Sequence, residues 1–140
     1  MPIELDDILL QKSSIIERAL RRVSEEYTLD PELESYTHTD ALILNLERAC
    51  QAVIDIAMHI VAKEHISVPK TSAHAFLMLR DTGIITDTSA RKMTAMTGFR
   101  NIAVHQYQSI NMDILRVIAE TGWKDIVDFC AELGIKIQVI

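Results

Sequence analysis

Apolar side chains recur at helical spacing along most of this chain, and few residues interrupt the pattern. Over residues 4–28, leucine, isoleucine, valine and tyrosine recur at roughly helical spacing. Residues 39–64 continue the pattern and are apolar around most of the circumference, which indicates a helix buried on several sides. Only four glycines and three prolines occur in 140 residues. We therefore expect long helices with few connections rather than many short strands.

Further helices are predicted from capping residues and chain breaks. Thr71 or Ser72 is a suitable cap for a short helix, and Thr86 or Asp87 for a longer one. Asn111 is a suitable cap for the last helix. The predicted ranges are about 72–80, 87–105 and 112–133.

The predicted fold class is all-α, an antiparallel bundle of four long helices plus a short one. A single domain is expected over residues 1–134, because Gly134 is a typical stop for the last helix. Residues 135–140 form a C-terminal tail that alternates like a strand. The pattern leaves open whether the tail lies on the bundle, contacts a partner or lacks order.

The net charge of −6 argues against a protein that coats nucleic acid through bulk charge. One stretch is nevertheless basic: residues 70–107 carry five Lys+Arg against two Asp+Glu. The acidic N-terminus is not typical of a signal peptide, and charged residues interrupt the apolar stretch 41–62, which argues against a membrane span. Cys50 and Cys130 make no disulfide framework. The expected location is the cytoplasm.

Arg100 and His105 are the residues most able to carry chemistry. An arginine presents a charged, planar fork that matches a phosphate, and a histidine exchanges protons near neutral pH. Together they suffice for RNA cleavage without a metal or cofactor: the histidine transfers a proton and the arginine stabilises charge on the phosphate. Asn101 can orient a neighbour or bind phosphate, and Tyr107 can donate a hydrogen bond or stack on a base.

The spacing of this pair restricts how they can act together. Five residues along a straight helix place Arg100 and His105 about 140° apart, at about 100° per residue. Either the helix ends near His105, or Arg100 reaches round, or the site is completed across a twofold axis. The last alternative predicts a homodimer with two motifs facing one cleft.

The longer string Arg100-Asn101-Ile102-Ala103-Val104-His105-Gln106-Tyr107 resembles the R-N-x3-H-x-Y signature of HEPN domains, in particular their HepT toxin branch. The strings I-L-N-L-E-R-A-C-Q-A-V-I-D-I-A-M-H-I and A-F-L-M-L-R-D-T-G-I-I are similar to the second helix and third segment of that family. The resemblance covers roughly residues 38–133.

This resemblance implies a toxin that is a dimeric, metal-independent endoribonuclease. The arginine and histidine of the family motif match Arg100 and His105, and its asparagine and tyrosine match Asn101 and Tyr107. The implied partners are an RNA substrate and a minimal nucleotidyltransferase antitoxin of the MntA type. That antitoxin would silence the toxin by adding AMP to Tyr107.

A polar stripe on the second helix has more than one interpretation. Asn45, Arg48, Asp55 and His59 share one face, which lines either a cleft or an interface. Asp55 and His59 could ligate a metal, but a salt bridge is the better-supported interpretation, and no metal site is predicted. Arg48 and Asp55 could instead support the motif helix. The alternative for the whole chain is a non-catalytic binding or regulatory subunit of a nucleotidyltransferase.

Overall fold

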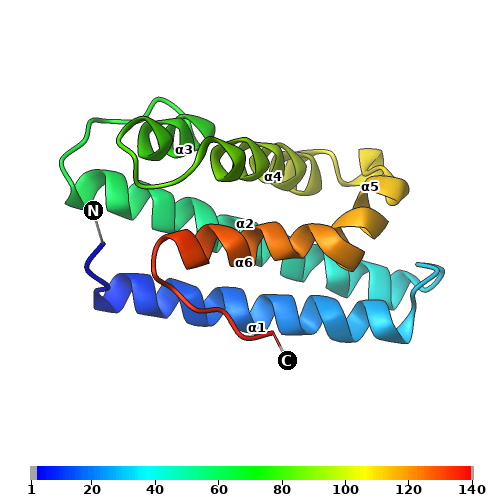
Figure 1. Ribbon diagram of the computed structural model, residues 1–140. Coiled ribbons are helices and arrows are strands. Elements are labelled where there is room, and N and C mark those ends of the chain that lie inside the picture. Colours follow the sequence, from blue (N-terminus) through cyan, green and yellow to red (C-terminus); the bar gives the residue numbers. More distant parts are fainter. Residues whose placement is uncertain (1–2, 140) are drawn as a thin grey trace.

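The computed structural model describes residues 3–139, and most of them are helical. The elements are α1 (Asp7–Leu29), α2 (Tyr36–Lys63), α3 (Ser72–Asp81), α4 (Asp87–His105), the 3₁₀ turn η1 (Tyr107–Ser109), α5 (Met112–Val117), the π turn η2 (Ile118–Gly122) and α6 (Trp123–Glu132). Residues 3–139 contain no strand, which confirms the predicted all-α class. The long helices are α1, α2, α4 and the α5–η2–α6 run, and α3 is the short one (Figure 1).

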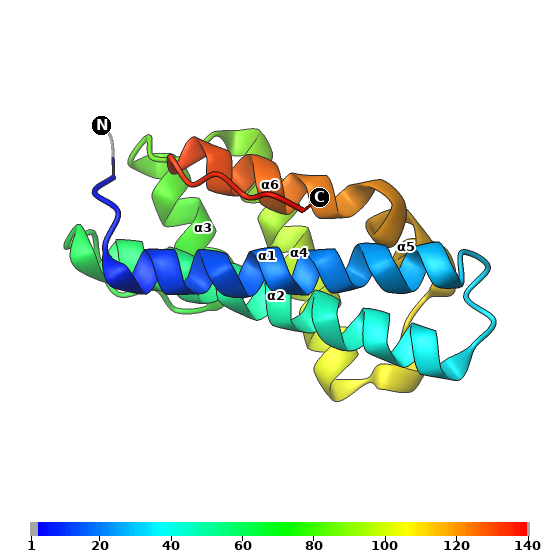
Figure 2. The ribbon, with the colours of Figure 1, turned by 90° about the horizontal axis from the view of Figure 1, so that it is seen from below.

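The antiparallel pair of α1 and α2 is the base of the molecule (Figures 1 and 2). Leu9, Ile16, Leu20 and Val23 recur every three to seven residues along α1 and are all buried, as the apolar period predicts. α2 begins three residues earlier than the sequence suggested. The cap is Ser35, whose hydroxyl accepts the backbone N–H of His38.

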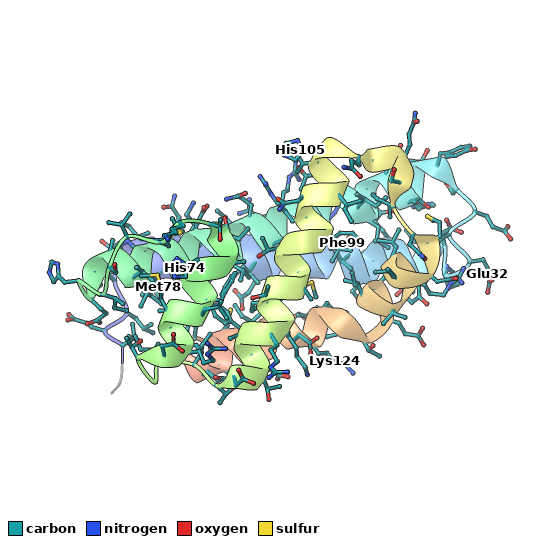
Figure 3. All side chains as sticks on the ribbon, turned by 90° about the horizontal axis from the view of Figure 1, so that it is seen from above. Glu32, His74, Met78, Phe99, His105 and Lys124 are labelled. Atoms are coloured by element: carbon teal, nitrogen blue, oxygen red, sulfur yellow. The ribbon has the colours of Figure 1, made fainter. Side chains whose placement is uncertain are left out.

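The other helices cover this pair. α6 runs above α1, whereas α4 crosses α2 at a steep angle (Figures 1 and 3). The Phe76 ring of α3 meets the Phe129 ring of α6 edge to face, with centroids 5.6 Å apart and planes at 80°. Buried residues from α1 to α6 form one continuous hydrophobic core.

The last long helix starts as expected but is not uniform. The Asn111 side chain caps α5 by accepting the N–H groups of Asp113 and Ile114 at 2.9 and 3.2 Å. After Val117 the backbone widens into η2, where the N–H of Trp123 donates to the carbonyl of Ile118, five residues back. A regular period of apolar residues continues through both α5 and α6, so the π turn is not predictable from the pattern.

The tail lies on the bundle, which is the first of the three possibilities left open. Ile135 and Ile137 are buried, and the chain runs beside α6 along α1 (Figure 2). The N–H of Gln138 donates to the Glu17 carboxylate at 2.8 Å, and its carbonyl accepts from Arg21 Nε at 3.1 Å. Residue 140 lies outside the described residues.

Within residues 3–139, no helix combines the length and the apolar character that crossing a bilayer requires.

Candidate functional site

The motif predicted from the sequence lies where α4 ends. Thr86 caps the start of α4, and the N–H of Gln106 closes its end by donating to the carbonyl of Ile102 at 2.8 Å. His105 is the last helical residue and is exposed. Figure 3 shows His105 on the final turn of α4, which extends past α2. The helix therefore ends at His105, as the first of the three geometric alternatives requires.

Arg100 lies one and a half turns earlier and is partly buried against α2. Its Nη1 donates to Asn101 Oδ1 at 3.3 Å, whereas its buried Nε has no hydrogen-bond partner among residues 3–139. The guanidinium charge acts on the Cys50 thiol of α2, although burial dominates and raises the pKa of Cys50 to about 12. Arg100 thus keeps hydrogen-bonding capacity that the described fold does not use, as expected of a group that binds an anion.

Tyr107 stands on η1, two residues past the end of α4. Its ring is 45% exposed, and its hydroxyl donates to the Asp40 carboxylate of α2. Partial burial, followed by this hydrogen bond and the negative charge of Asp40, raises the pKa of Tyr107 to about 12. The phenol is therefore held neutral and in a fixed position at the edge of the motif.

Asp40 is the site residue that the sequence analysis missed. On α2 it shares a face with Glu47, because a step of seven residues is close to two helical turns. Its role depends on a contact between positions 67 residues apart, which no local pattern shows.

Tyr107 and Asp40 also line a groove. It has a volume of about 460 Å³ and lies between the start of α2, the loop before it and the segment that follows η1. Its walls include Tyr36, Thr39, Asp40, Ile43, Tyr107 and Met112.

The structure does not bring Asp55 to Arg100 or His105. The Asp55 carboxylate faces α1, where it accepts from Lys12 Nζ at 3.0 Å, and it also accepts from Gln51 at 2.8 Å. His59, one turn on, contacts Asp6 at 2.7 Å. These are the polar contacts preferred over a metal site, and residues 3–139 contain no group of three or more possible metal ligands.

Arg48 is exposed and shares the face of α2 that carries Asp55 and His59. This face is turned about 90° from the one that carries Asp40 and Glu47, at about 100° per residue. The α2 residue that contacts the motif within one copy is Asp40, which accepts the hydrogen bond of the Tyr107 hydroxyl.

Large apolar side chains remain exposed around the motif. On α4 they are Ile102 and Val104, at 40% and 39% exposure, and on α5 they are Ile114 and Val117, at 53% and 60%. Apolar residues gathered beside a polar site mark a surface that suits contact with another protein.

Comparison with known proteins agrees with the family resemblance and with the fold. A family model described as ribonuclease HepT-like matches residues 14–133. The chain is 34% identical over 126 residues to an mRNA nuclease HepT of Shewanella oneidensis, covering 89% of this chain and 95% of that protein. It is 32% identical over 87 residues to a tRNA nuclease HepT of Aphanizomenon flos-aquae, covering 62% of this chain and 59% of the relative.

Solved structures show the same arrangement of helices. A tri-AMPylated HEPN toxin of Shewanella oneidensis in complex with MNT antitoxin superposes with a TM-score of 0.88 at 33% identity, covering 93% of this chain and 98% of that one. A toxin–antitoxin complex with AMP-PNP superposes with a TM-score of 0.87 at 32% identity, covering 92% and 98%.

Proposed function

Because the chain belongs to the HepT-like ribonuclease family, we propose that it is the toxin of a toxin–antitoxin pair and cleaves RNA in the cytoplasm. The observation that carries the proposal is the end of α4, where Arg100 has a buried Nε without a partner among residues 3–139 and His105, five residues later, is exposed. The relatives at 34% and 32% identity are named as nucleases for mRNA and tRNA.

The proposed reaction is a transesterification at phosphorus. The ribose 2′-oxygen attacks the neighbouring phosphate, the bond to the 5′-oxygen breaks, and the products carry 2′,3′-cyclic phosphate and 5′-hydroxyl ends. His105 accepts the 2′-hydroxyl proton or donates one to the leaving oxygen. Arg100 stabilises the added charge on phosphate, and Asn101 orients its guanidinium. These roles require no metal or cofactor.

We further propose that the working form is a homodimer. Arg100 and His105 make no hydrogen bond to each other in one copy, and the apolar residues beside them on α4 and α5 are exposed. A twofold axis at this face would bring two motifs together and cover Ile102, Val104, Ile114 and Val117.

The proposed partner is a nucleotidyltransferase antitoxin of the MntA type. In its reaction the Tyr107 hydroxyl oxygen attacks the α-phosphorus of ATP, pyrophosphate leaves, and the tyrosine proton is released. The support is that Tyr107 is exposed next to His105 and that a structural relative is AMPylated and bound to an MNT antitoxin. A nucleotide on Tyr107 would occupy the space that RNA needs.

A non-catalytic regulatory subunit is the alternative, favoured by the absence of direct contact between Arg100 and His105 in residues 3–139 of one copy. In that case Tyr107 and the surface around it would matter, whereas His105 would be dispensable.

The deciding experiment is cleavage of a defined RNA in EDTA by protein whose Tyr107 carries no AMP, as shown by mass. We expect cyclic phosphate ends, and a fall of about 10²–10⁴-fold in kcat for His105→Ala, the contribution typical of one proton-transfer group. Arg100→Ala should be similarly impaired. Arg91→Ala is the matched control, because it removes an exposed arginine from the same helix. Equal cleavage by wild type and His105→Ala would refute the catalytic assignment.

A further inference from the structure

The groove beside Tyr107 has the composition of a site for a flat, partly polar ligand. Two aromatic rings border it, Tyr107 at 45% exposure and Tyr36 at 87%, and Ile43 and Met112 supply apolar surface. Its volume of about 460 Å³ falls within the range of about 300–1,000 Å³ that is usual for small-molecule sites. Exposed tyrosine rings are the platforms on which proteins stack bases of single-stranded RNA.

An unsatisfied polar atom in the wall points to a missing polar partner. Thr39 is only 8% exposed, and its Oγ1 has no hydrogen-bond partner among residues 3–139. Thr39 lines the groove, so a ligand there is the nearest source of that partner after a small side-chain rotation.

The charge of the groove selects which part of a nucleotide fits. Glu34 and Asp40 lie in the wall, and none of the ten lining residues is a lysine or arginine. Two carboxylates repel a phosphate but accept hydrogen bonds from the amino group of a base. The phosphate would instead lie toward Arg100, whose Nε is unpaired within the described residues.

We propose that this groove is a base-binding subsite that holds an amino-bearing nucleobase of the RNA strand, adjacent to the phosphate bound at Arg100. The base stacks between Tyr36 and Tyr107, and its amino group donates to Glu34 or Asp40. The proposal rests on the proposed ribonuclease function for the identity of the strand, but the groove and its ligand can be tested separately.

Binding is tested first, without catalysis. The ¹⁵N-labelled full-length protein is titrated with adenosine, cytidine and uridine, which have no phosphate for Arg100 to bind. We expect amide shifts that cluster at residues 33–43 and 107–112, with adenosine and cytidine binding more tightly than uridine. Tyr36→Ala should weaken binding by about tenfold, which is within the usual effect of one stacking contact. Leu29→Ala removes a similarly exposed apolar residue outside the groove and should change nothing.

The second measurement asks whether the bound base belongs to RNA. Cleavage sites are mapped on a randomised RNA for wild type, Glu34→Gln and the neighbouring control Glu32→Gln. We expect wild type to prefer adenine or cytosine beside the cut, Glu34→Gln to lose several-fold of that preference, and Glu32→Gln to retain it. Both glutamates are exposed, so neither change should disturb folding.

The outcomes separate the two proposals. Shifts at the groove without RNA cleavage would support the base site and refute the ribonuclease function. Cleavage without nucleoside-induced shifts at the groove would support the ribonuclease function and refute the base site. Nucleoside binding with an unchanged cleavage preference in Glu34→Gln would overturn the assignment to an RNA base and leave a nucleotide on Tyr107 as the occupant.

Discussion

The contact between Tyr107 and Asp40 links the motif to a helix that the motif itself does not contain. Tyr107 lies past the end of α4, on a three-residue turn that contributes no buried side chain. Its hydroxyl is nevertheless positioned, because the Asp40 carboxylate of α2 accepts its hydrogen bond. A nucleophilic hydroxyl in a fixed place pays less entropy on reaction than a free one. We therefore expect Asp40 to affect both the acidity of Tyr107 and its modification.

The first prediction concerns the pKa of Tyr107. Asp40→Asn removes a negative charge that disfavours the phenolate, so the pKa should fall from about 12 toward the usual value, though not fully, since partial burial remains. Tyr27→Phe and Tyr36→Phe in the background leave Tyr107 as the only tyrosine. Ultraviolet absorbance at about pH 11 should then show more phenolate in Asp40→Asn than in its parent.

Glu34→Gln is the matched control, because it removes a nearby carboxylate that does not bind the hydroxyl. An equal phenolate fraction in Asp40→Asn and its parent would show that Asp40 does not raise the pKa of Tyr107.

At this scale the sequence located the motif residues but not their surroundings. Arg100, His105 and Tyr107 were predicted because an eight-residue string has the four residues that a family signature specifies. Asp40 was not found, because a contact across 67 positions depends on how α2 and η1 are placed by the core. The helical period of α2 did place Asp55 and His59 on one face, but only the structure shows that this face meets α1.

Among the elements, α1 is joined to the end of α2 by one aspartate. Asp6 caps α1 by accepting the N–H of Leu9 at 2.9 Å, and it also accepts from His59 and from Lys63 Nζ, at 2.7 and 3.1 Å. The hydrogen bonds from His59 and Leu9 hold the pKa of Asp6 well below its usual range. The contacts of one carboxylate thus tie the start of α1 to the end of α2.

The second prediction is that the stability of the fold depends on pH through the ionisation of Asp6. A folded-state pKa below the unfolded value of about 3.9 means that the stabilisation is fully present above that pH and is lost as pH falls toward the lowered pKa. Asp6→Asn should therefore have a lower Tm than wild type at pH 7, and the two should converge as pH falls below about 4. Asp7→Asn, which changes an exposed aspartate in the same turn, should show a smaller gap. A gap that stays constant down to about pH 2 would exclude this linkage.

The elements themselves were largely predictable, for identifiable reasons. Thr71, Thr86 and Asn111 were recognised as caps, and all three accept backbone N–H groups. The start of α2 was placed too late, because the apolar pattern becomes clear only after residue 38, whereas the cap is Ser35. The π turn was missed because one widened turn leaves the apolar period on either side intact. The position of the tail depends on Glu17 and Arg21 of α1, more than a hundred residues away.

The molecule as a whole is acidic, yet the region at the end of α4 carries Arg100 and exposed apolar side chains. The net charge of −6 would repel RNA at long range, so binding depends on local groups around Arg100. Large apolar side chains of α4 and α5 are exposed as well. A second copy that covers them would also double the number of arginines facing the substrate.

The third prediction is the oligomeric state. Val104→Asp and Ile114→Asp place a charge on the exposed apolar surface, so sedimentation should show a dimer for wild type and a monomer for the variants, with unchanged helix content. RNA cleavage should fall at least tenfold in the same variants, if the site needs both copies. Val68→Asp, in the loop between α2 and α3 and 85% exposed, is the control and should remain dimeric and active. An active monomer would contradict the two-copy site.

The two free cysteines are buried under different helices. Cys50 lies on α2 near Arg100 of α4, and Cys130 lies on α6. Burial raises the pKa of both thiols to about 12, so neither forms the reactive thiolate at neutral pH while the helices stay in place. Each sulfur can react only in the moments when its own covering helix opens. The alkylation rate of Cys50 therefore reports how often α4 separates from α2. The alkylation rate of Cys130 reports how often α6 separates from the core.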